Sequence, residues 1–258
     1  MAAILFLGEE LKDKYAKLYL RKLGYEILDY YIQNKIIDYI VLPLDGIKKD
    51  ELFENLVKNN INKTYFVYEI TPFMWEIKTK YNLKFIELKK DKELNNILDI
   101  TRSEALLMYS IEILPITLKD AKILIIGSNE SINIIANDFK KYVNKVLLAI
   151  NKEINKDLDL DNIKTIKFNE LSENIKNFDL IINTFPSLII DEKILRNVSP
   201  SSYILDLAPF PGGVDYYKAK QFGIYAFLLD SIGSKVSPKT VGIEYAKAIN
   251  RGITQWEN

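Results

Sequence analysis

Short apolar runs alternate with longer amphipathic segments along the first part of the chain. The apolar runs predict strands at residues 3–7, 39–42, 65–68 and 84–86, and helical spacing between them predicts helices at 12–23, 50–59 and 71–81. Strands and helices that alternate in this way are typical of a parallel sheet covered by helices. We therefore expect the first part of the chain to form an α/β domain.

A long helical pattern at residues 95–114 leads into a second alternation. Pro115 ends this pattern, so we place a domain boundary there and interpret the helix as a connecting spine. The second part predicts strands at 121–126, 145–150, 165–168, 180–183, 203–207 and 224–228, the element order of a doubly wound nucleotide-binding domain. We expect domains at residues 1–114 and 115–237, with the last helix, 238–252, completing the first.

The charge balance narrows the classes of partner. The chain has 35 basic and 35 acidic side chains. Nucleic-acid-binding proteins usually carry a basic excess that contacts phosphates, so we expect no nucleic-acid partner. No apolar run approaches the ~20 residues that span a bilayer, and the chain opens without a signal peptide. We therefore expect a cytoplasmic protein with no membrane contact.

Cysteine and histidine are both absent from the sequence. Without cysteine there is no disulfide, no thiolate nucleophile and no thiolate metal ligand. Without histidine, any proton transfer has to use Asp, Glu, Lys, Tyr or water. Histidine triads and histidine metal sites are excluded, and we expect no metal site.

The segment from Asp179 to Asp215 carries the strongest signal for a ligand site. It contains two predicted strands, each followed by a distinctive turn, Thr184-Phe185-Pro186 after the first and Pro209-Phe210-Pro211-Gly212-Gly213 after the second. Ligands of open parallel sheets bind beyond the carboxyl ends of the strands. The segment therefore predicts a small-molecule site and favours an enzyme that handles nucleotides.

A third strand end, Gly127-Ser128-Asn129-Glu130-Ser131-Ile132, stands where a dinucleotide-binding loop would lie. Such a loop uses three glycines: for a tight turn, for the approach of the pyrophosphate, and for close packing of helix on strand. Asn129 and Ile132 occupy the second and third positions, and we expect Ile132 to push the helix away or to force repacking. The helix N-terminus would still attract an anion. The loop fits either a modified pyrophosphate site or a plain strand–turn–helix without nucleotide binding.

The next predicted strand ends at Asn151 and Lys152. An acidic residue at this position would select NAD, whereas a basic residue would accept the 2′-phosphate of NADP. The two residues favour NADP, and a solvated loop explains them equally well.

Taken together, these motifs resemble the A subunit of the dipicolinate synthase family of spore-forming bacteria. The resemblance is carried by Ile182-Asn183-Thr184-Phe185-Pro186-Ser187, by Leu205-Asp206-Leu207-Ala208 with Pro211-Gly212-Gly213-Val214-Asp215, and by Pro238-Lys239-Thr240 with Gly242. It implies a flavodoxin-like domain followed by a Rossmann domain, distantly similar to 2-hydroxyacid dehydrogenases. It also implies NADP-linked oxidation of a dihydrodipicolinate-type cyclic dicarboxylate to dipicolinate during sporulation, and its implied partner is a flavoprotein-like B subunit. The sequence leaves open whether the protein forms a homo-oligomer.

Two departures from the family pattern bear on function. The full Gly-x-Gly-x-x-Gly of the family has lost two glycines, and Phe210 stands where arginine is typical. Arginine is the best bidentate partner for a carboxylate, so its loss removes a strong contact from a dicarboxylate site. An alternative is therefore a cofactor-impaired Rossmann scaffold that binds a partner protein. The third interpretation, a 2-hydroxyacid dehydrogenase with another substrate, is weakened by the absence of the histidine on which such enzymes normally rely.

The candidate site residues follow from the motifs and the resemblance. For the cofactor they are Gly127, Ser128, Asn129, Glu130, Ser131, Asn151, Lys152, Asn183, Thr184, Pro186, Asp206, Leu207 and Ala208, and for the substrate Pro211, Gly212, Gly213, Lys239, Thr240 and Glu104. Asp206 and Lys239 are the catalytic candidates: Asp206 orients the cofactor or accepts a proton, and Lys239 pairs with a substrate carboxylate at a helix N-terminus.

Several of these candidates have a structural alternative. Asp206 can simply hold the loop that follows it. The Pro211–Gly213 loop can be an ordinary turn instead of exposing its backbone N–H groups to a carboxylate or phosphate. Glu104 can be a solvated carboxylate on a helix, and we expect Asp215 to cap the helix that follows it.

Overall fold

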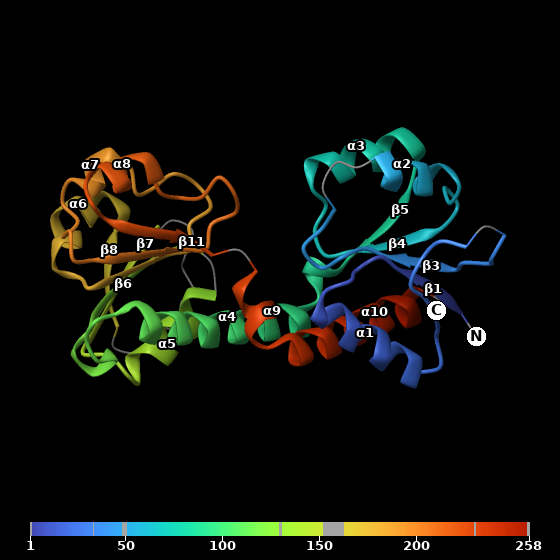
Figure 1. The fold of residues 1–258 in the computed structure, drawn as a ribbon, viewed down its shortest axis with the longest axis horizontal. Helices are drawn as coiled ribbons and strands as arrows, with labels where there is room; N and C mark the ends of the chain where they lie inside the picture. The colour runs from blue at the N-terminus through green and yellow to red at the C-terminus, as the bar shows by residue number, and fades with distance from the viewer. Residues whose placement is uncertain are drawn as a thin grey trace. The chain divides into compact units, whose positions relative to one another are not determined.

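The structure is a computed structural model, and it describes residues 2–32, 34–47, 51–128, 131–151, 163–229 and 231–256. The chain forms two compact units (Figure 1): unit 1 is Met1–Thr101 with Gly233–Asn258, and unit 2 is Arg102–Ile232. Helix α4 (Lys92–Ile113), the predicted spine, contributes residues to both units. The predicted domain boundaries at residues 114 and 237 differ from the limits of these two units, and they remain a prediction.

Unit 1 contains a five-stranded parallel sheet of order β2-β1-β3-β4-β5. Its strands are β1 (Ala3–Phe6), β2 (Glu26–Leu28), β3 (Tyr39–Val41), β4 (Thr64–Val67) and β5 (Lys84–Glu87). This is the flavodoxin-like order, in which the chain reverses its winding between β1 and β3. Sequence analysis missed β2 because its three residues follow the first helix too closely to form a separate apolar run.

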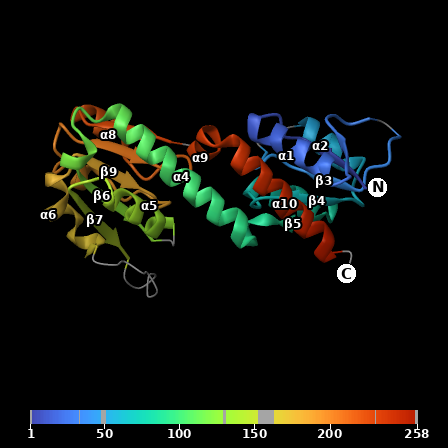
Figure 2. The ribbon, with the colours of Figure 1, turned by 90° about the horizontal axis from the view of Figure 1, so that it is seen from below.

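Helices cover both faces of this sheet. They are α1 (Leu11–Lys22), α2 (Glu51–Lys58), α3 (Pro72–Tyr81), the first part of α4, and α10 (Pro238–Trp256). Because side chains alternate along a strand, Ile4 and Phe6 face α1 and α10, whereas Leu5 faces α2 and α3. Helices α1 and α10 lie side by side in both views (Figures 1 and 2). A Cβ atom at Gly242 would stand 2.1 Å from the Lys12 carbonyl oxygen, so this glycine permits their close packing.

Unit 2 contains a six-stranded parallel sheet of order β11-β10-β9-β6-β7-β8. Its strands are β6 (Lys122–Gly127), β7 (Lys145–Ile150), β8 (Lys164–Lys167), β9 (Leu180–Asn183), β10 (Tyr203–Asp206) and β11 (Tyr225–Leu228). Numbered from β6, this is the Rossmann order 3-2-1-4-5-6, with its switch point between β6 and β9. The predicted fold class, two doubly wound parallel α/β sheets, is confirmed.

The helices of unit 2 include α5 (Ser131–Lys140), α6 (Leu171–Asn174), α7 (Glu192–Leu195), α8 (Tyr216–Gln221) and the start of α9 (Ile232–Val236). Leu171, Leu195 and Ala219, from α6, α7 and α8, share one buried cluster with the β9 and β10 residues Ile181 and Ile204. Short stretches of 3-10 helix (Leu88–Lys90, Leu118–Asp120, Phe168–Glu170 and Ile175–Asn177) complete the chain.

Capping residues explain where several helices begin. The Thr71 hydroxyl accepts the Met74 N–H at 3.3 Å, and Pro72 follows as the first residue of α3. The Asp215 carboxylate accepts the Lys218 N–H at 3.0 Å, which confirms its predicted role as the cap of α8.

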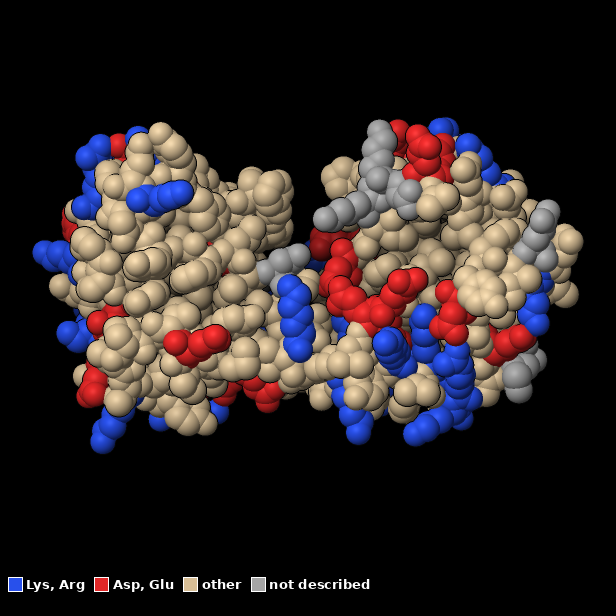
Figure 3. All heavy atoms as spheres, viewed as in Figure 1, with Lys and Arg blue, Asp and Glu red and all other residues tan. Residues whose placement is uncertain are grey.

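The surface carries both signs of charge. Lysine, arginine and acidic side chains appear on both units on the face that Figure 3 shows, in keeping with the equal counts of 35. Within the described part of the chain, every helix is too short or too polar to cross a membrane.

Candidate functional site

The carboxyl ends of β6, β9 and β10 lie at the same end of the unit 2 sheet because all its strands are parallel. In register, Asn183 of β9 is the neighbour of Ile126 on one side and of Asp206 on the other. The turns that sequence analysis selected after β9 and β10 are therefore adjacent, on one side of the switch point. Ligands of open α/β sheets bind at this carboxyl end of the strands.

Asp206 is completely buried, and its carboxylate accepts four hydrogen bonds. One carboxylate oxygen accepts the Asn183 side-chain amide at 2.8 Å and the Ala208 N–H at 3.0 Å. The other accepts the Gly213 N–H at 2.7 Å and the Tyr216 hydroxyl at 2.6 Å. These contacts favour the alternative in which Asp206 holds the following loop, since its acceptor sites are directed at protein donors. Its roles in catalysis and cofactor orientation stay predictions.

Asn183 extends this network to the turn after β9. Its side-chain oxygen accepts the Phe185 N–H at 3.1 Å, and its amide nitrogen also donates to the Phe185 carbonyl at 3.2 Å. A Cβ atom at Gly213 would stand 2.2 Å from that amide nitrogen, so only glycine lets the two turns approach so closely. The Asp206 and Asn183 side chains thus fix two neighbouring turns to each other.

The loop after β10 does not offer the free amide groups that sequence analysis expected. Pro211 has no N–H, the Gly212 N–H donates to the Pro209 carbonyl at 2.8 Å, and the Gly213 N–H donates to Asp206. The expectation of exposed N–H groups was wrong, because the buried carboxylate and the turn itself use them. The Phe210–Pro211 peptide bond is cis, and the Phe210 side chain at the tip is 88% exposed. A role of this loop in substrate binding stays a prediction.

Tyr216 is the residue that sequence analysis missed. Burial, together with the hydrogen bond to Asp206, raises the pKa of its hydroxyl well above the ordinary 10.0. The hydroxyl therefore stays protonated and remains a donor to Asp206. A tyrosine directly after a helix cap gave no sequence signal, because its contact depends on how the preceding loop folds back.

Gly127, at the end of β6, contacts the turn that follows β9 on the other side of the switch point. A Cβ atom at Gly127 would stand 2.2 Å from the Thr184 hydroxyl and 2.4 Å from a methyl group of Ile132. The Thr184 hydroxyl donates to the Ile126 carbonyl at 3.1 Å. Ile132 is completely buried, so the first turn of α5 packs on the glycine through this side chain. Of the two outcomes expected for Ile132, repacking around the side chain fits these contacts.

The remaining predicted cofactor residues lie at several places in unit 2. Leu207 donates its N–H to the Asn183 carbonyl at 2.8 Å, Ala208 is buried, and Pro186 is exposed. Ser131 begins α5 and is buried, Ser128 precedes it, and Asn151 directly follows β7. Asn129, Glu130 and Lys152 lie outside the described residues. The cofactor roles of all these residues stay predictions.

The predicted substrate residues outside the loop lie on two helices. Lys239 and Thr240 are both exposed in the first turn of α10 in unit 1. Glu104 is exposed on the part of α4 that belongs to unit 2. Their roles in binding substrate stay predictions.

The two sheet orders define the class of the protein: a two-unit α/β protein with a Rossmann sheet, the fold of dehydrogenases. Across its full length the chain is similar to a D-isomer specific 2-hydroxyacid dehydrogenase of Lactobacillus delbrueckii in its NAD-complexed form. The match covers 100% of this chain and 97% of that chain, with a TM-score of 0.62 and 14% identity. This similarity concerns the fold alone.

The similarity to the A subunit of dipicolinate synthase is greater. The fold matches the protein of Bacillus halodurans with a TM-score of 0.86 and 19% identity over 97% of each chain. It matches the Bacillus subtilis protein with a TM-score of 0.83 and 21% identity over 100% of this chain and 98% of that one. In sequence, the chain is 38% identical to the curated Bacillus subtilis protein over 86 residues, 33% of this chain and 29% of that protein. No family model matches the chain. The predicted resemblance to the dipicolinate synthase family is confirmed.

Proposed function

We propose that this protein is a dipicolinate synthase A subunit that oxidises a dihydrodipicolinate-type cyclic dicarboxylate to dipicolinate with NADP as hydride acceptor. The observation that carries the proposal is the 86-residue match at 38% identity. It aligns with less than a third of that relative, so the fold and the site residues have to supply the rest of the argument.

Two features of the described residues around the switch point support a dinucleotide site. The strand end at Gly127 is followed by the N-terminus of α5, the arrangement that receives a pyrophosphate in Rossmann domains. The absence of a side chain at Gly127 permits contact with Thr184 and Ile132, so the turn keeps the tight geometry of the first glycine position. Ser128, Ser131 and Asn151 are the described residues that would hold the phosphates and ribose.

The chemistry is the removal of two hydrogens from the ring. The cofactor, when bound, takes one hydrogen with its electron pair as hydride at the nicotinamide, and the second leaves as a proton to a base. Lacking histidine, this chain would supply that base from a carboxylate, a water or a partner protein. The network of Asp206, Asn183 and Tyr216 would position the turns beside the nicotinamide, and Lys239 would pair with a substrate carboxylate.

A titration of the purified protein with NADPH and NADH, followed by nicotinamide fluorescence, tests the cofactor site. We expect saturation below millimolar concentration, with NADPH binding more tightly. Gly127→Ala should abolish binding because its Cβ would collide with Thr184 and Ile132. Gly8→Ala is the matched control and should leave nucleotide binding unchanged. Its Cβ would make a similar clash, 2.3 Å from the Asp13 carboxyl carbon, but at the corresponding place in unit 1. Circular dichroism checks that both variants fold.

The activity itself is tested by mixing the protein with NADP and the cyclic substrate, alone and with a flavoprotein-like B subunit. Formation of NADPH and dipicolinate in equal amounts supports the proposal. Absence of saturation by either nucleotide at millimolar concentration would refute the dehydrogenase and leave the scaffold alternative. That alternative is favoured by one observation, the replacement of two loop glycines by Asn129 and Ile132.

A further inference from the structure

Strand β11 forms one edge of the unit 2 sheet, and its outer side is unpaired among the described residues. Leu229 donates its N–H to the Asp206 carbonyl at 2.7 Å, so residues 229, 227 and 225 direct their backbone groups toward β10. Since backbone groups alternate along a strand, those of Ala226 and Leu228 point outward. The outer edge thus presents N–H and C=O groups that another strand could pair with.

Within the described part of the chain, strand β11 lacks the lysine and proline by which proteins often prevent such pairing. Natural edge strands are protected by lysine, proline, bulges or a covering element. The sequence of β11 is Tyr-Ala-Phe-Leu, with no charge and no proline. Its aromatic side chains are exposed, Tyr225 to 60% and Phe227 to 40%, and the Tyr225 ring stacks on Tyr203 of β10. The strand therefore offers an apolar, hydrogen-bonding edge.

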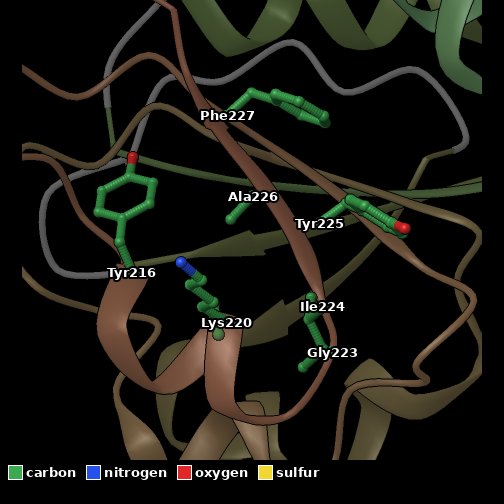
Figure 4. Close-up of a pocket in the computed structure, with 8 residues that line it drawn as sticks. Tyr216, Lys220, Gly223, Ile224, Tyr225, Ala226 and Phe227 are labelled. Atoms are coloured by element: carbon green, nitrogen blue, oxygen red, sulfur yellow. The ribbon is translucent and has the colours of Figure 1, made fainter.

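A groove runs along this edge between β11 and helix α8. It has a volume of about 380 Å³. Its lining residues are Tyr216, Ala219 and Lys220 of α8, Gly223 and Ile224 in the turn before β11, and Tyr225, Ala226 and Phe227 of the strand (Figure 4). Three consecutive residues of β11 line the groove, a stretch about 10 Å long at roughly 3.3 Å per residue. A groove that follows the backbone of an edge strand fits an extended chain, as in the addition of a peptide strand to a sheet.

Charge indicates which chain would occupy the groove. Lys220 is the charged residue of the lining, and it is exposed. Helix α8 carries Lys218 as well and no acidic residue, and Lys218 already pairs with Glu192 at 3.1 Å. Antiparallel pairing of two copies through β11 would bring two basic α8 helices together, which repulsion disfavours. A strand with a carboxylate has no such cost.

We propose that the groove along β11 binds an extended segment of another protein, which adds a strand to the sheet and places an acidic side chain beside Lys220. Its apolar side chains would cover Tyr225 and Phe227. Its backbone would pair with the outward groups of Ala226 and Leu228, while those of Tyr225 and Phe227 keep their bonds to β10.

Amide hydrogen exchange measured by NMR tests this pairing residue by residue. The probe is a short synthetic peptide of alternating valine and threonine with one glutamate, and its twin carries lysine in place of glutamate. At about ten times its Kd, the glutamate peptide should slow exchange of the Ala226 and Leu228 amides roughly tenfold. The Tyr225 and Phe227 amides should change little, because they are already bonded.

Two variants complete the test. Ala226→Pro removes an outward N–H that the folded unit does not use, so the unit should fold and the peptide should no longer bind. Lys220→Glu should reverse the preference between the two peptides. Absence of protection with either peptide at millimolar concentration overturns the proposal, and so does an unchanged preference in Lys220→Glu. A free protein that is dimeric by light scattering and becomes monomeric in Ala226→Pro would show that a second copy occupies the groove, which also overturns it.

Discussion

Replacing Asp206 by asparagine separates the two roles considered for this residue. The carboxylate accepts from Asn183, Ala208, Gly213 and Tyr216 at 2.6–3.0 Å in a fully buried position. An asparagine has nearly the same shape but presents an NH₂ group on one side. The Tyr216 hydroxyl can rotate to accept from that group, whereas the Gly213 N–H on the same side would face a donor.

The cost follows from the number of bonds affected. One buried N–H left without an acceptor costs about 1–3 kcal/mol, and each remaining bond weakens by about 1 kcal/mol when its acceptor loses charge. Removing a buried charge returns part of this free energy. We therefore expect Asp206→Asn to lower the free energy of unfolding of unit 2 by about 3 kcal/mol. Tyr216→Phe leaves three donors in place and should cost no more than this, about 1.5–3 kcal/mol.

Two spectroscopic probes in a urea titration show which unit has lost stability. Trp75 and Trp256 both belong to unit 1, so tryptophan fluorescence reports unit 1 and circular dichroism reports both units. The Asp206→Asn change should move the circular-dichroism transition and leave the fluorescence transition in place. Asp191→Asn is the matched control: Asp191 caps α7 through the Ile194 N–H, and asparagine caps as well as aspartate.

An Asp206→Asn protein with unchanged stability would refute the loop-holding role. If that stable variant also lost oxidation of the dicarboxylate while still binding NADPH, proton transfer by Asp206 would be the better account. The opposite pattern, lower stability of unit 2 with residual turnover in the folded fraction, supports a positioning role.

Three further predictions concern the packing and the charges of the two units. Ile132→Ala should destabilise unit 2 by about 2–5 kcal/mol, measured by circular dichroism in urea, because Ile132 is completely buried against Gly127; a loss below about 1 kcal/mol would contradict this packing. Burial would raise the pKa of Asp91, but hydrogen bonds from Arg251 and from backbone N–H groups, together with the charge of Arg251, outweigh it and hold the pKa below 3.8. Unit 1 should therefore lose stability as the pH falls below 3.8, and Arg251→Gln should flatten this loss in fluorescence-detected unfolding; an unchanged acid limb would argue against the pair. Burial raises the pKa of Asp13 above 3.8, so its ionisation should destabilise unit 1 as the pH rises through that higher pKa, and Asp13→Asn should remove this decline; a decline that persists would have another cause.

The periodicity of apolar residues predicted the α/β class and most of the strands. Apolar runs such as 145–150 and 180–183 became strands with those bounds, because a buried parallel strand needs an uninterrupted apolar sequence. The short β2 carried too little pattern to be found. The order of the strands in each sheet followed from the alternation of elements and the resemblance, and not from any single residue.

The contacts at the strand ends were harder to predict. Sequence position placed Asp206, Asn183 and the Pro211–Gly213 loop at one sheet edge, and the structure brings them into contact. Position alone could not show that the carboxylate uses the glycine N–H group, since this depends on a loop that folds back over its own strand. The same limit hid Tyr216, whose hydroxyl reaches Asp206 from the next helix.

The hydrogen bonds within this loop change what substrate recognition requires. Because the Gly212 and Gly213 N–H groups are engaged, the loop cannot offer them to a carboxylate without breaking bonds to Pro209 and Asp206. Phe210 at the exposed tip supplies no charge in place of the arginine typical of the family. Recognition of a dicarboxylate by this chain would then depend on cations outside the loop, of which Lys239 at the start of α10 is the predicted one. The substrate proposal therefore depends more on Lys239 than on the glycine loop that first suggested it.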